Sequence, residues 1–407
     1  MPGPDDLNLS GAELEDAPPY ELDPDPRPAT APQAAKAPPV DLRRWSLSAA
    51  AEELVKRCEG ARAGGGFPWP GCASEWPDEE SNAAPLAPGC LLPGDRANWI
   101  EVWKAVGPLA PDRLAVLVGP TGRGKTAFAV QAAEAAAAAG RPVLYASAEL
   151  GAAELLARIL AAGAARGPRV VTWRAILYGR IDQDEVERAC SRATVDLPAL
   201  YLWAPPGRER NGDTLRAMVE AVAEAHKAPP LVIVDYVQRF APGGGDRRVD
   251  VSDLSGELRT LARPAGRYLG AGVLALSSTA RTNYAKVTSA AALYAVARSS
   301  LEELVGTGKE TGELEYDANA VAVLTADPKA AQDGRRRGLL VAAKVRELEP
   351  GRMAGLRFDG ARGRWEDGPG VVGDLEAEAS EARAQRSGDG GPKSTRTNSP
   401  TRPPRPR

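Results

Sequence analysis

The sequence predicts an α/β fold: a mostly parallel central sheet with helices on both faces and antiparallel strands at one edge. The first observation is that short, continuously apolar runs alternate with helical segments from about residue 108 to residue 368. The second is that the apolar run 114–118 leads through the glycine-rich sequence GPTGRGKT, residues 119–126, into the alanine-rich segment 127–139. The order strand, glycine-rich loop, helix is typical of such a domain.

Composition indicates one folded body with disordered ends. The 42 Gly and 36 Pro residues are concentrated toward the termini, where too few large apolar side chains remain to offset the entropy of ordering. We therefore expect four segments. They are a disordered, acidic and Pro-rich leader (1–39), a poorly defined segment with short helices (40–107), one α/β domain (108–368) and a disordered basic tail (369–407).

Charge and cysteine usage restrict the function classes. A net charge of −3 gives no global basic field, so a nucleic acid would have to meet local patches. Four cysteines without a C-x-x-C pair and a single histidine indicate neither a zinc ribbon nor a disulfide framework. With no signal peptide and no run of eighteen apolar residues, we expect a cytoplasmic protein that does not contact membranes.

Within the domain, the apolar and amphipathic patterns place the elements in order. We expect strands at residues 114–118, 142–147, 199–203, 231–235 and 272–276. The expected helices are 125–139, 152–162, two short ones within 169–192, 214–227, and 251–268 with a bend near Pro264. Further strands near 320–324, 338–344 and 355–358 are expected as antiparallel additions at one edge.

Residues 119–126, here called the phosphate loop, have the spacing G-x4-G-K-T. Glycines permit the tight curvature and close approach with which backbone N–H groups surround a phosphate chain. The loop consists of Gly119, Pro120, Thr121, Gly122, Arg123, Gly124, Lys125 and Thr126. Lys125 is expected to reach the β- and γ-phosphates and Thr126 to bind Mg²⁺, while the following helix directs its positive end at the same point. The alternative is an ordinary glycine-rich turn.

Two carboxylates follow predicted strands at the edge where the phosphate loop lies. Asp235 ends the strand LVIVD and is expected to help hold Mg²⁺. Glu149 follows the strand PVLYAS and is a candidate general base for the attacking water. The alternatives are a strand-end Asp that caps a turn and a Glu favoured by the dipole of the next helix.

Five motifs in this order resemble the RecA-like motor domain of the DnaB family of replicative helicases. They are GPTGRGKT, RPVLYASAEL, LVIVDYVQ, VLALSSTAR and AAKVRELEPGRMAGLRFDGARGRWED, and they cover about residues 108–368. The resemblance implies a RecA-like P-loop NTPase that uses ATP and Mg²⁺. It also implies hexameric rings that hydrolyse ATP at subunit interfaces, move on single-stranded DNA and unwind duplex, with replication proteins as possible partners.

The resemblance assigns further roles by position. Lys125, Thr126, Glu149 and Asp235 match the phosphate-binding, metal-binding and catalytic positions. Lys344 and Arg346, here called the basic pair, match a Lys-x-Arg motif whose side chains reach the γ-phosphate held by the neighbouring subunit. A charge supplied in trans couples hydrolysis to assembly. Without the resemblance, a solvated strand with alternating charges is the better interpretation.

Three features depart from the family pattern. Ser278 stands where the family has a Gln that senses the γ-phosphate, which puts nucleotide sensing in doubt. Asn319 replaces an acid in the run EYDAN. Residues 40–107 show neither the length nor the pattern of the family's helical collar, so we expect a ring formed by the motor alone, with the helix at 98–106 packed on a neighbouring subunit.

The sequence gives only weak indications of which residues would contact DNA. Flexible, glycine-containing loops beside cations suit a backbone that is bound without sequence preference, but solvated loops remain nearly as plausible. The candidates are Arg247, Arg248, Arg281 and Lys286. Residues 335–337 offer a third basic patch, for which a charged hairpin tip is the better interpretation.

Two functions are the main alternatives, and a third, a non-catalytic nucleotide-binding subunit, would need both carboxylates to be idle. The first is an ATP-driven, ring-forming DNA helicase motor, which the basic pair and the two carboxylates favour. The second is a RecA-fold ATPase that acts as a switch or scaffold on a protein partner without unwinding. Ser278 and the weak candidates for DNA contact favour the second.

Overall fold

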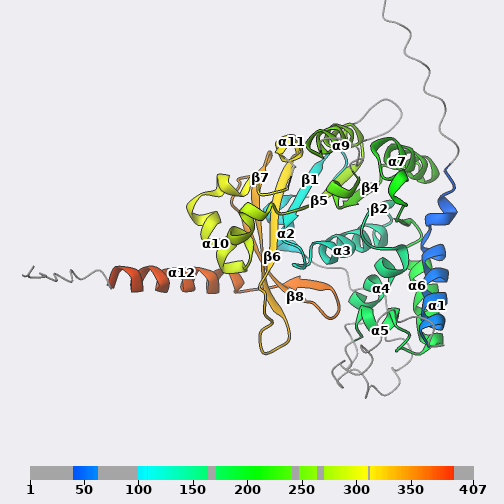
Figure 1. Ribbon diagram of the computed structural model, residues 1–407, viewed down its shortest axis with the longest axis horizontal. Helices are drawn as coiled ribbons and strands as arrows, with labels where there is room; N and C mark the ends of the chain where they lie inside the picture. The colour runs from blue at the N-terminus through cyan, green and yellow to red at the C-terminus, as the bar shows by residue number, and fades with distance from the viewer. Residues whose placement is uncertain are drawn as a thin grey trace, which may run out of the picture. The chain divides into compact units, whose positions relative to one another are not determined.

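The computed structural model describes residues 40–62, 99–107, 109–163, 171–240, 247–263, 270–309 and 312–388. The predicted leader, residues 63–98 and the last part of the predicted tail lie outside these ranges. The folded part is organised on one nine-stranded sheet with the order β3-β2-β4-β5-β1-β6-β7-β8-β9 (Figure 1).

The α/β fold with a parallel sheet core is confirmed. Strands β3, β2, β4, β5, β1 and β6 pair in parallel. Their bounds are Leu114–Gly119 (β1), Val143–Ser147 (β2), Leu200–Trp203 (β3), Leu231–Asp235 (β4), Gly272–Ser278 (β5) and Ala320–Ala326 (β6). Every residue of β2, β3, β4 and β6 is buried, as expected for strands covered on both faces.

The antiparallel edge differs from the expectation in two respects. Strand β6 is parallel to β1, so the antiparallel part begins only at β7. It consists of Arg336–Val345 (β7), Met353–Asp359 (β8) and Arg364–Asp367 (β9). Strand β9 was not predicted, because four residues with three charges have no apolar pattern, yet it contains the buried Trp365.

Helices cover both faces of the sheet. Those of the first half of the chain pack on one face and those of the second half on the other, and each face has its own apolar core. The first set is α1 (Leu47–Arg62), α2 (Ile100–Val106), α3 (Lys125–Ala138), α4 (Ala152–Gly163), α5 (Trp173–Leu177) and α6 (Gln183–Asp196). The second is α7 (Gly212–His226), α8 (Val237–Phe240), α9 (Arg247–Ala262), α10 (Ala290–Ser299), α11 (Gly312–Asp317) and α12 (Val371–Gly388). Short 3₁₀ helices are η1 (Leu42–Trp45), η3 (Gly207–Glu209), η4 (Arg281–Val287) and η5 (Leu301–Leu304).

Segments before and after the expected domain belong to the same body. Helix α1 packs against α4 and α6. Helix α2 lies on the chain's own sheet: the Trp99 ring beside it stacks on Phe128 with 4.3 Å between centroids, and Arg352 Nη1 donates to Lys104 O (3.0 Å). Helix α2 is therefore part of the chain's own fold, and its packing on a neighbouring subunit stays a prediction.

Residues 371–388 form α12, where the sequence indicated a disordered tail. The first turns of this helix are held by Val371 and Leu375, which are buried in the second core beside α10 and β8. None of the helices in the described residues is both long and apolar enough to cross a membrane.

Candidate functional site

The phosphate loop connects β1 to α3, as predicted. Gly122 and Gly124 have positive φ angles of 74° and 89°, which disfavour any side chain. A Cβ at Gly119 would lie 2.3 Å from Leu324 O, so the loop begins where two strand backbones approach closely. Gly124 is the N-cap of α3 and leaves the first N–H groups of the helix without a side-chain cap. Such N–H groups can bind an anion.

The Lys125 side chain folds back to the start of the phosphate loop. Its Nζ donates to Gly119 O (2.7 Å) and Pro120 O (3.0 Å). Burial lowers the pKa of Lys125 to about 8, and the negative charges of Asp235 and Glu149 oppose that decrease. A phosphate bound in the loop would offset this cost of burying the ammonium charge.

Asp235 lies at the carboxyl end of β4 and is 2% exposed. The Tyr145 hydroxyl donates to its Oδ2 (2.8 Å). Burial raises the pKa of Asp235, while hydrogen bonds with Tyr145 and Thr126 and the charge of Lys125 lower it. The contact with Thr126 brings the buried carboxylate to the first turn of α3.

Glu149 lies at the same edge of the sheet as Asp235. Strands β2 and β4 are neighbours, with Ser147 opposite Asp235, and Ala148 N donates to Asp235 O (2.8 Å). Glu149 follows immediately and is exposed. Sheet order therefore brings both predicted carboxylates to the side of the sheet where the phosphate loop lies.

The oxygen atoms of Thr126 and Asp235 fit a Mg²⁺ ion. This ion typically takes one or two protein oxygens and keeps water and phosphate oxygens as its other ligands. Among the described residues, no group of three or more His, Cys, Asp or Glu side chains could hold a metal by itself. A metal that binds together with nucleotide phosphates needs no such group.

The end of β5 lies next to the phosphate loop. Ser278 is opposite Gly119 in the register, and Gln238 Nε2 donates to Ser277 Oγ (2.9 Å) and to Lys309 O (2.6 Å). A cleft of about 1040 Å³ lies beside the end of β5. Thr121 of the loop and Tyr284 of η4 both line this cleft, and the Thr121 N–H donates to the Tyr284 hydroxyl (3.1 Å).

The basic pair lies near the amino ends of the parallel strands, whereas the phosphate loop lies at their carboxyl ends. Arg346 N donates to Asn319 O and Asn319 N donates to Leu114 O, so Arg346 is close to the amino end of β1. The phosphate loop begins at the other end of that strand, about 20 Å away for six residues. Arg346 therefore does not meet the phosphate loop of its own chain.

Both cations of the basic pair contact backbone carbonyls of α11. Lys344 Nζ donates to Glu315 O (3.0 Å) and to Tyr316 O. Arg346 Nη2 donates to Tyr316 O and Asp317 O, each at 3.3 Å. Burial, and then the charge of Arg346, lowers the pKa of Lys344.

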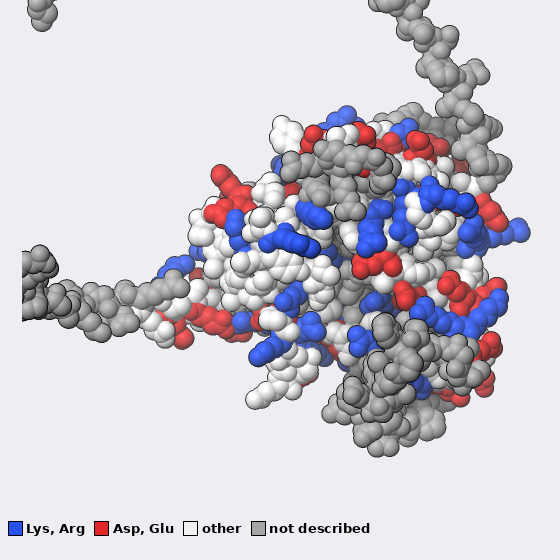
Figure 2. All heavy atoms as spheres, in the orientation of Figure 1, with Lys and Arg blue, Asp and Glu red and all other residues white. Residues whose placement is uncertain are grey.

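The candidates for DNA contact are only partly brought together. Arg281 lines the cleft and is exposed, whereas Lys286 is paired with Glu303 (2.9 Å). Arg247 and Arg248 belong to α9 rather than to a loop, and their side chains lie outside the described residues. On the face shown in Figure 2, basic and acidic side chains of the described residues are interspersed.

The third basic patch has structural partners. Arg335 pairs with Glu366 (2.8 Å), and Arg337 pairs with Asp327 (3.0 Å) and with Glu378. Arg336 lies over the Phe358 ring at 5.9 Å from its centroid. These contacts suit a charged hairpin, with Arg336 and Arg337 at the start of β7, and that interpretation stays a prediction.

Sequence reasoning missed Tyr145, Arg158 and Tyr284. A Tyr within the buried strand VLYAS is a usable signal, because a buried hydroxyl requires a partner. Arg158 on α4 stacks on Trp173 at 4.0 Å, and burial lowers the pKa of its guanidinium. For Tyr284 the sequence offers no signal, since its contact depends on how β1 and β5 pair.

Comparisons with known proteins find similar sequences. A family model described as the DnaB-like helicase C-terminal domain matches residues 97–367. The replicative DNA helicase DnaB of Haemophilus influenzae is 24% identical over 279 residues, which are 67% of this chain and 55% of the relative. That of Buchnera aphidicola subsp. Schizaphis graminum is 23% identical over 245 residues, 60% of this chain and 48% of the relative. The chain thus spans about half the length of the curated relatives it matches.

A solved structure shares the fold. It is a DnaB-like replicative helicase described with its interactions with primase. Its TM-score is 0.50 at 18% sequence identity, and the match covers 80% of this chain and 76% of that chain. At this identity the likeness concerns the fold alone.

Proposed function

The chain belongs to the family of DnaB-like helicase C-terminal domains, and from this membership we propose that it is the motor of a ring-forming, ATP-driven DNA helicase. In this proposal, ATP bound with Mg²⁺ is hydrolysed at the interfaces between copies of the chain. The ring moves along single-stranded DNA, and replication proteins are its partners.

One observation carries the proposal. Lys125 and Thr126, at the start of α3, meet the buried carboxylate of Asp235, with Glu149 at the same edge of the sheet. Phosphoryl transfer needs these components: a cradle with a cation, a metal-binding carboxylate and a group that orients water.

Each residue has a role in the proposed reaction. The loop N–H groups and Lys125 bind the phosphates, and Thr126 and Asp235 hold Mg²⁺, which supplies charge neutralisation. Glu149 accepts a proton from the attacking water as it is aligned with the γ-phosphate. Because the basic pair is remote from its own loop, Arg346 of one copy stabilises the charge that develops on the phosphates bound by the next copy.

A second function is favoured by specific observations. Ser278 replaces the sensing Gln, Lys286 is paired with Glu303, and the charges on the face in Figure 2 are mixed. These features suit an ATPase switch or scaffold that binds a protein partner and does not unwind DNA.

The test is the ATPase rate of the full chain with and without single-stranded DNA, combined with a strand-displacement assay and a native-mass measurement. The helicase predicts hydrolysis that DNA stimulates, displacement of a strand and a hexamer. Lys125→Ala is the control that should abolish turnover. Hydrolysis without DNA stimulation or displacement would instead support the switch, and normal hydrolysis by Lys125→Ala would refute the site.

A further inference from the structure

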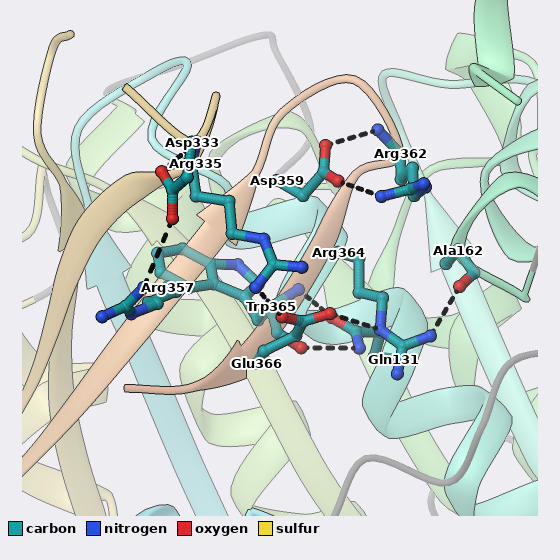
Figure 3. Close-up of polar contacts among 10 residues, drawn as sticks. All are labelled: Gln131, Ala162, Asp333, Arg335, Arg357, Asp359, Arg362, Arg364, Trp365 and Glu366. Carbon is teal, nitrogen blue, oxygen red and sulfur yellow. Dashed lines mark hydrogen bonds and ion pairs between the residues drawn. The ribbon is translucent and has the colours of Figure 1, made fainter. Parts of the chain in front are cut away.

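Trp365 on β9 connects the antiparallel edge of the sheet to the phosphate loop. Its ring is buried, with 1% of the residue exposed. The indole Nε1–H donates to Gly124 O (2.9 Å). The Trp365 backbone N–H donates to Gln131 Oε1 (2.6 Å), and Gln131 Nε2 donates back to Trp365 O (3.1 Å). Trp365 is therefore tied to the first two turns of α3 at three points, and Figure 3 shows it lying against Gln131.

The hydrogen bond to Gly124 O also affects the Lys125 N–H, because both groups belong to one peptide unit. Gly124 O also accepts the first helical hydrogen bond, from Phe128 N (2.9 Å), so the indole occupies its remaining lone pair. In a planar trans peptide the carbonyl and the following N–H point in opposite directions. Fixing the Gly124 carbonyl therefore also fixes the Lys125 N–H, one of the donors at the start of α3.

The ring also determines which residue can stand at position 124. A Cβ at Gly124 would lie 2.8 Å from the Trp365 ring, so the indole occupies the space above the glycine. Two independent features therefore require glycine at position 124: its φ angle of 89° and the space that the indole occupies. The Trp365 ring thus packs directly against the backbone of the phosphate loop.

The other side of the ring is held by the strands of the antiparallel edge. The Phe358 ring packs at 4.6 Å between centroids, and a Cβ at Gly338 would lie 2.3 Å from the indole. Gly338 is on β7, the strand that carries Lys344. The support behind Trp365 is therefore continuous with the strand of the basic pair.

An ion pair within the β8–β9 hairpin and a hydrogen bond to α4 support this region (Figure 3). Arg362 pairs with Asp359 across the β8–β9 turn (2.8 Å). Arg364 Nη1 donates to Ala162 O at the end of α4 (2.9 Å). Strand β9 thus has contacts with β8, α3 and α4, and the indole N–H reaches Gly124 from this strand.

We infer that Trp365 is a positioning residue for the phosphate loop. It preorganises the Gly124–Lys125 peptide for nucleotide phosphates, and the β8–β9 hairpin is part of the nucleotide site. This inference rests on the proposed ATP binding. A buried indole N–H needs an acceptor wherever it lies, but here the acceptor is the Gly124 carbonyl, which shares its peptide plane with the Lys125 N–H of the phosphate loop.

The test is Trp365→Phe in the full chain, which keeps an aromatic ring and removes the N–H donor. We expect ATP to bind about three- to tenfold more weakly, the effect of one lost hydrogen bond. Affinity is measured by titration with a fluorescent ATP analogue, and stability by urea unfolding. Gln131→Met, which removes the tether to β9, should weaken binding in the same direction and keeps the test valid if Trp365→Phe does not fold.

Trp203→Phe is the matched control. Trp203 is also 1% exposed, but it lies on β3 in the second core, where it packs on Phe240 at 5.7 Å between centroids. This variant should lose stability and retain wild-type affinity for ATP. If Trp365→Phe likewise loses stability while its affinity stays within twofold of wild type, the positioning role is overturned and the proposed function stands. A wild-type chain that binds no ATP overturns both.

Discussion

The backbone N–H of Thr121 donates to the hydroxyl of Tyr284, with 3.1 Å between the two atoms. The phosphate loop is thereby joined to η4, the segment that follows β5 and begins with Arg281. The resemblance predicts that Ser278 is too short for the sensing role of a Gln at its position. A direct link from the loop to the segment after β5 nevertheless exists in this chain.

This link predicts the effect of Tyr284→Phe. Removing the hydroxyl leaves the Thr121 N–H without this partner, so η4 should open more often. Trypsin should then cleave after Arg281 and Lys286 about fivefold faster, which corresponds to one hydrogen bond of about 1 kcal/mol. Tyr294→Phe on the adjacent α10 is the control, and equal cleavage rates in the two variants would show that the hydrogen bond does not hold η4.

Nucleotide affinity should depend on pH through Lys125. Its pKa of about 8 means that the free protein loses this proton as the pH rises above 8. Bound phosphates keep the ammonium charged, so binding takes up a proton and affinity falls with rising pH. Between pH 7 and pH 9 the dissociation constant for Mg·ATP should rise by about tenfold.

Lys125→Arg is the control for that titration, because a guanidinium keeps its charge over this range. Its affinity for Mg·ATP is expected to be lower at every pH and independent of pH. A wild-type profile as flat as that of Lys125→Arg would contradict the assignment of the titrating group.

Mixing two inactive variants should restore activity if Arg346 acts in trans. An Arg346→Ala subunit retains Glu149, and a Glu149→Gln subunit retains Arg346. In a random equimolar ring, about one quarter of the interfaces would combine the intact Glu149 with the intact Arg346 of the next copy, because the reacting groups come from two subunits. The recovered ATPase rate is the measurement.

The control for mixing is Arg346→Ala combined with the double variant Glu149→Gln/Arg346→Ala, in which no intact Arg346 remains. It should recover nothing. Failure of the first mixture to recover at any ratio would count against a role in trans.

The buried pair of Tyr145 and Asp235 predicts a pH-dependent loss of stability. Tyr145→Phe removes the donor to Asp235 Oδ2 and should lower the free energy of unfolding by about 1–3 kcal/mol near neutral pH. Burial already raises the pKa of Asp235, so its folded state holds a proton more readily than its unfolded state. Such a group favours folding at low pH, and that contribution is lost as the pH rises.

Without the Tyr145 hydroxyl, the pKa of Asp235 should rise further. The stability difference between Tyr145→Phe and wild type should therefore grow from acid to neutral pH in urea unfolding. Tyr201→Phe is the control, because Tyr201 lies on β3, the strand next to β2, and its hydroxyl contacts His226 at the end of α7 (2.9 Å). Its stability difference should not follow this trend, and a parallel trend in both variants would exclude Asp235 as the cause.

Local signals explain what the sequence predicted well. The phosphate loop was readable because positive φ angles at Gly122 and Gly124 require glycine and because the flanking strand and helix have distinct periodicities. Asp235 and Glu149 were readable because parallel strands end at a common edge. Strand β9 and helix α12 were not, since their order depends on the single buried side chains Trp365, Val371 and Leu375.

The sequence by itself determined the α/β class, the phosphate loop and the strand ends that carry its carboxylates, because these follow from backbone conformation and from patterns within about ten neighbouring residues. The tertiary structure alone decided the partners of these groups: Tyr145 for Asp235, 90 residues away, Tyr284 for Thr121, 163 residues away, and Trp365 for Gly124, 241 residues away. It also placed the basic pair near the amino ends of the parallel strands, far from the phosphate loop of the same chain. Such contacts depend on the order and direction of nine strands, which no local pattern encodes.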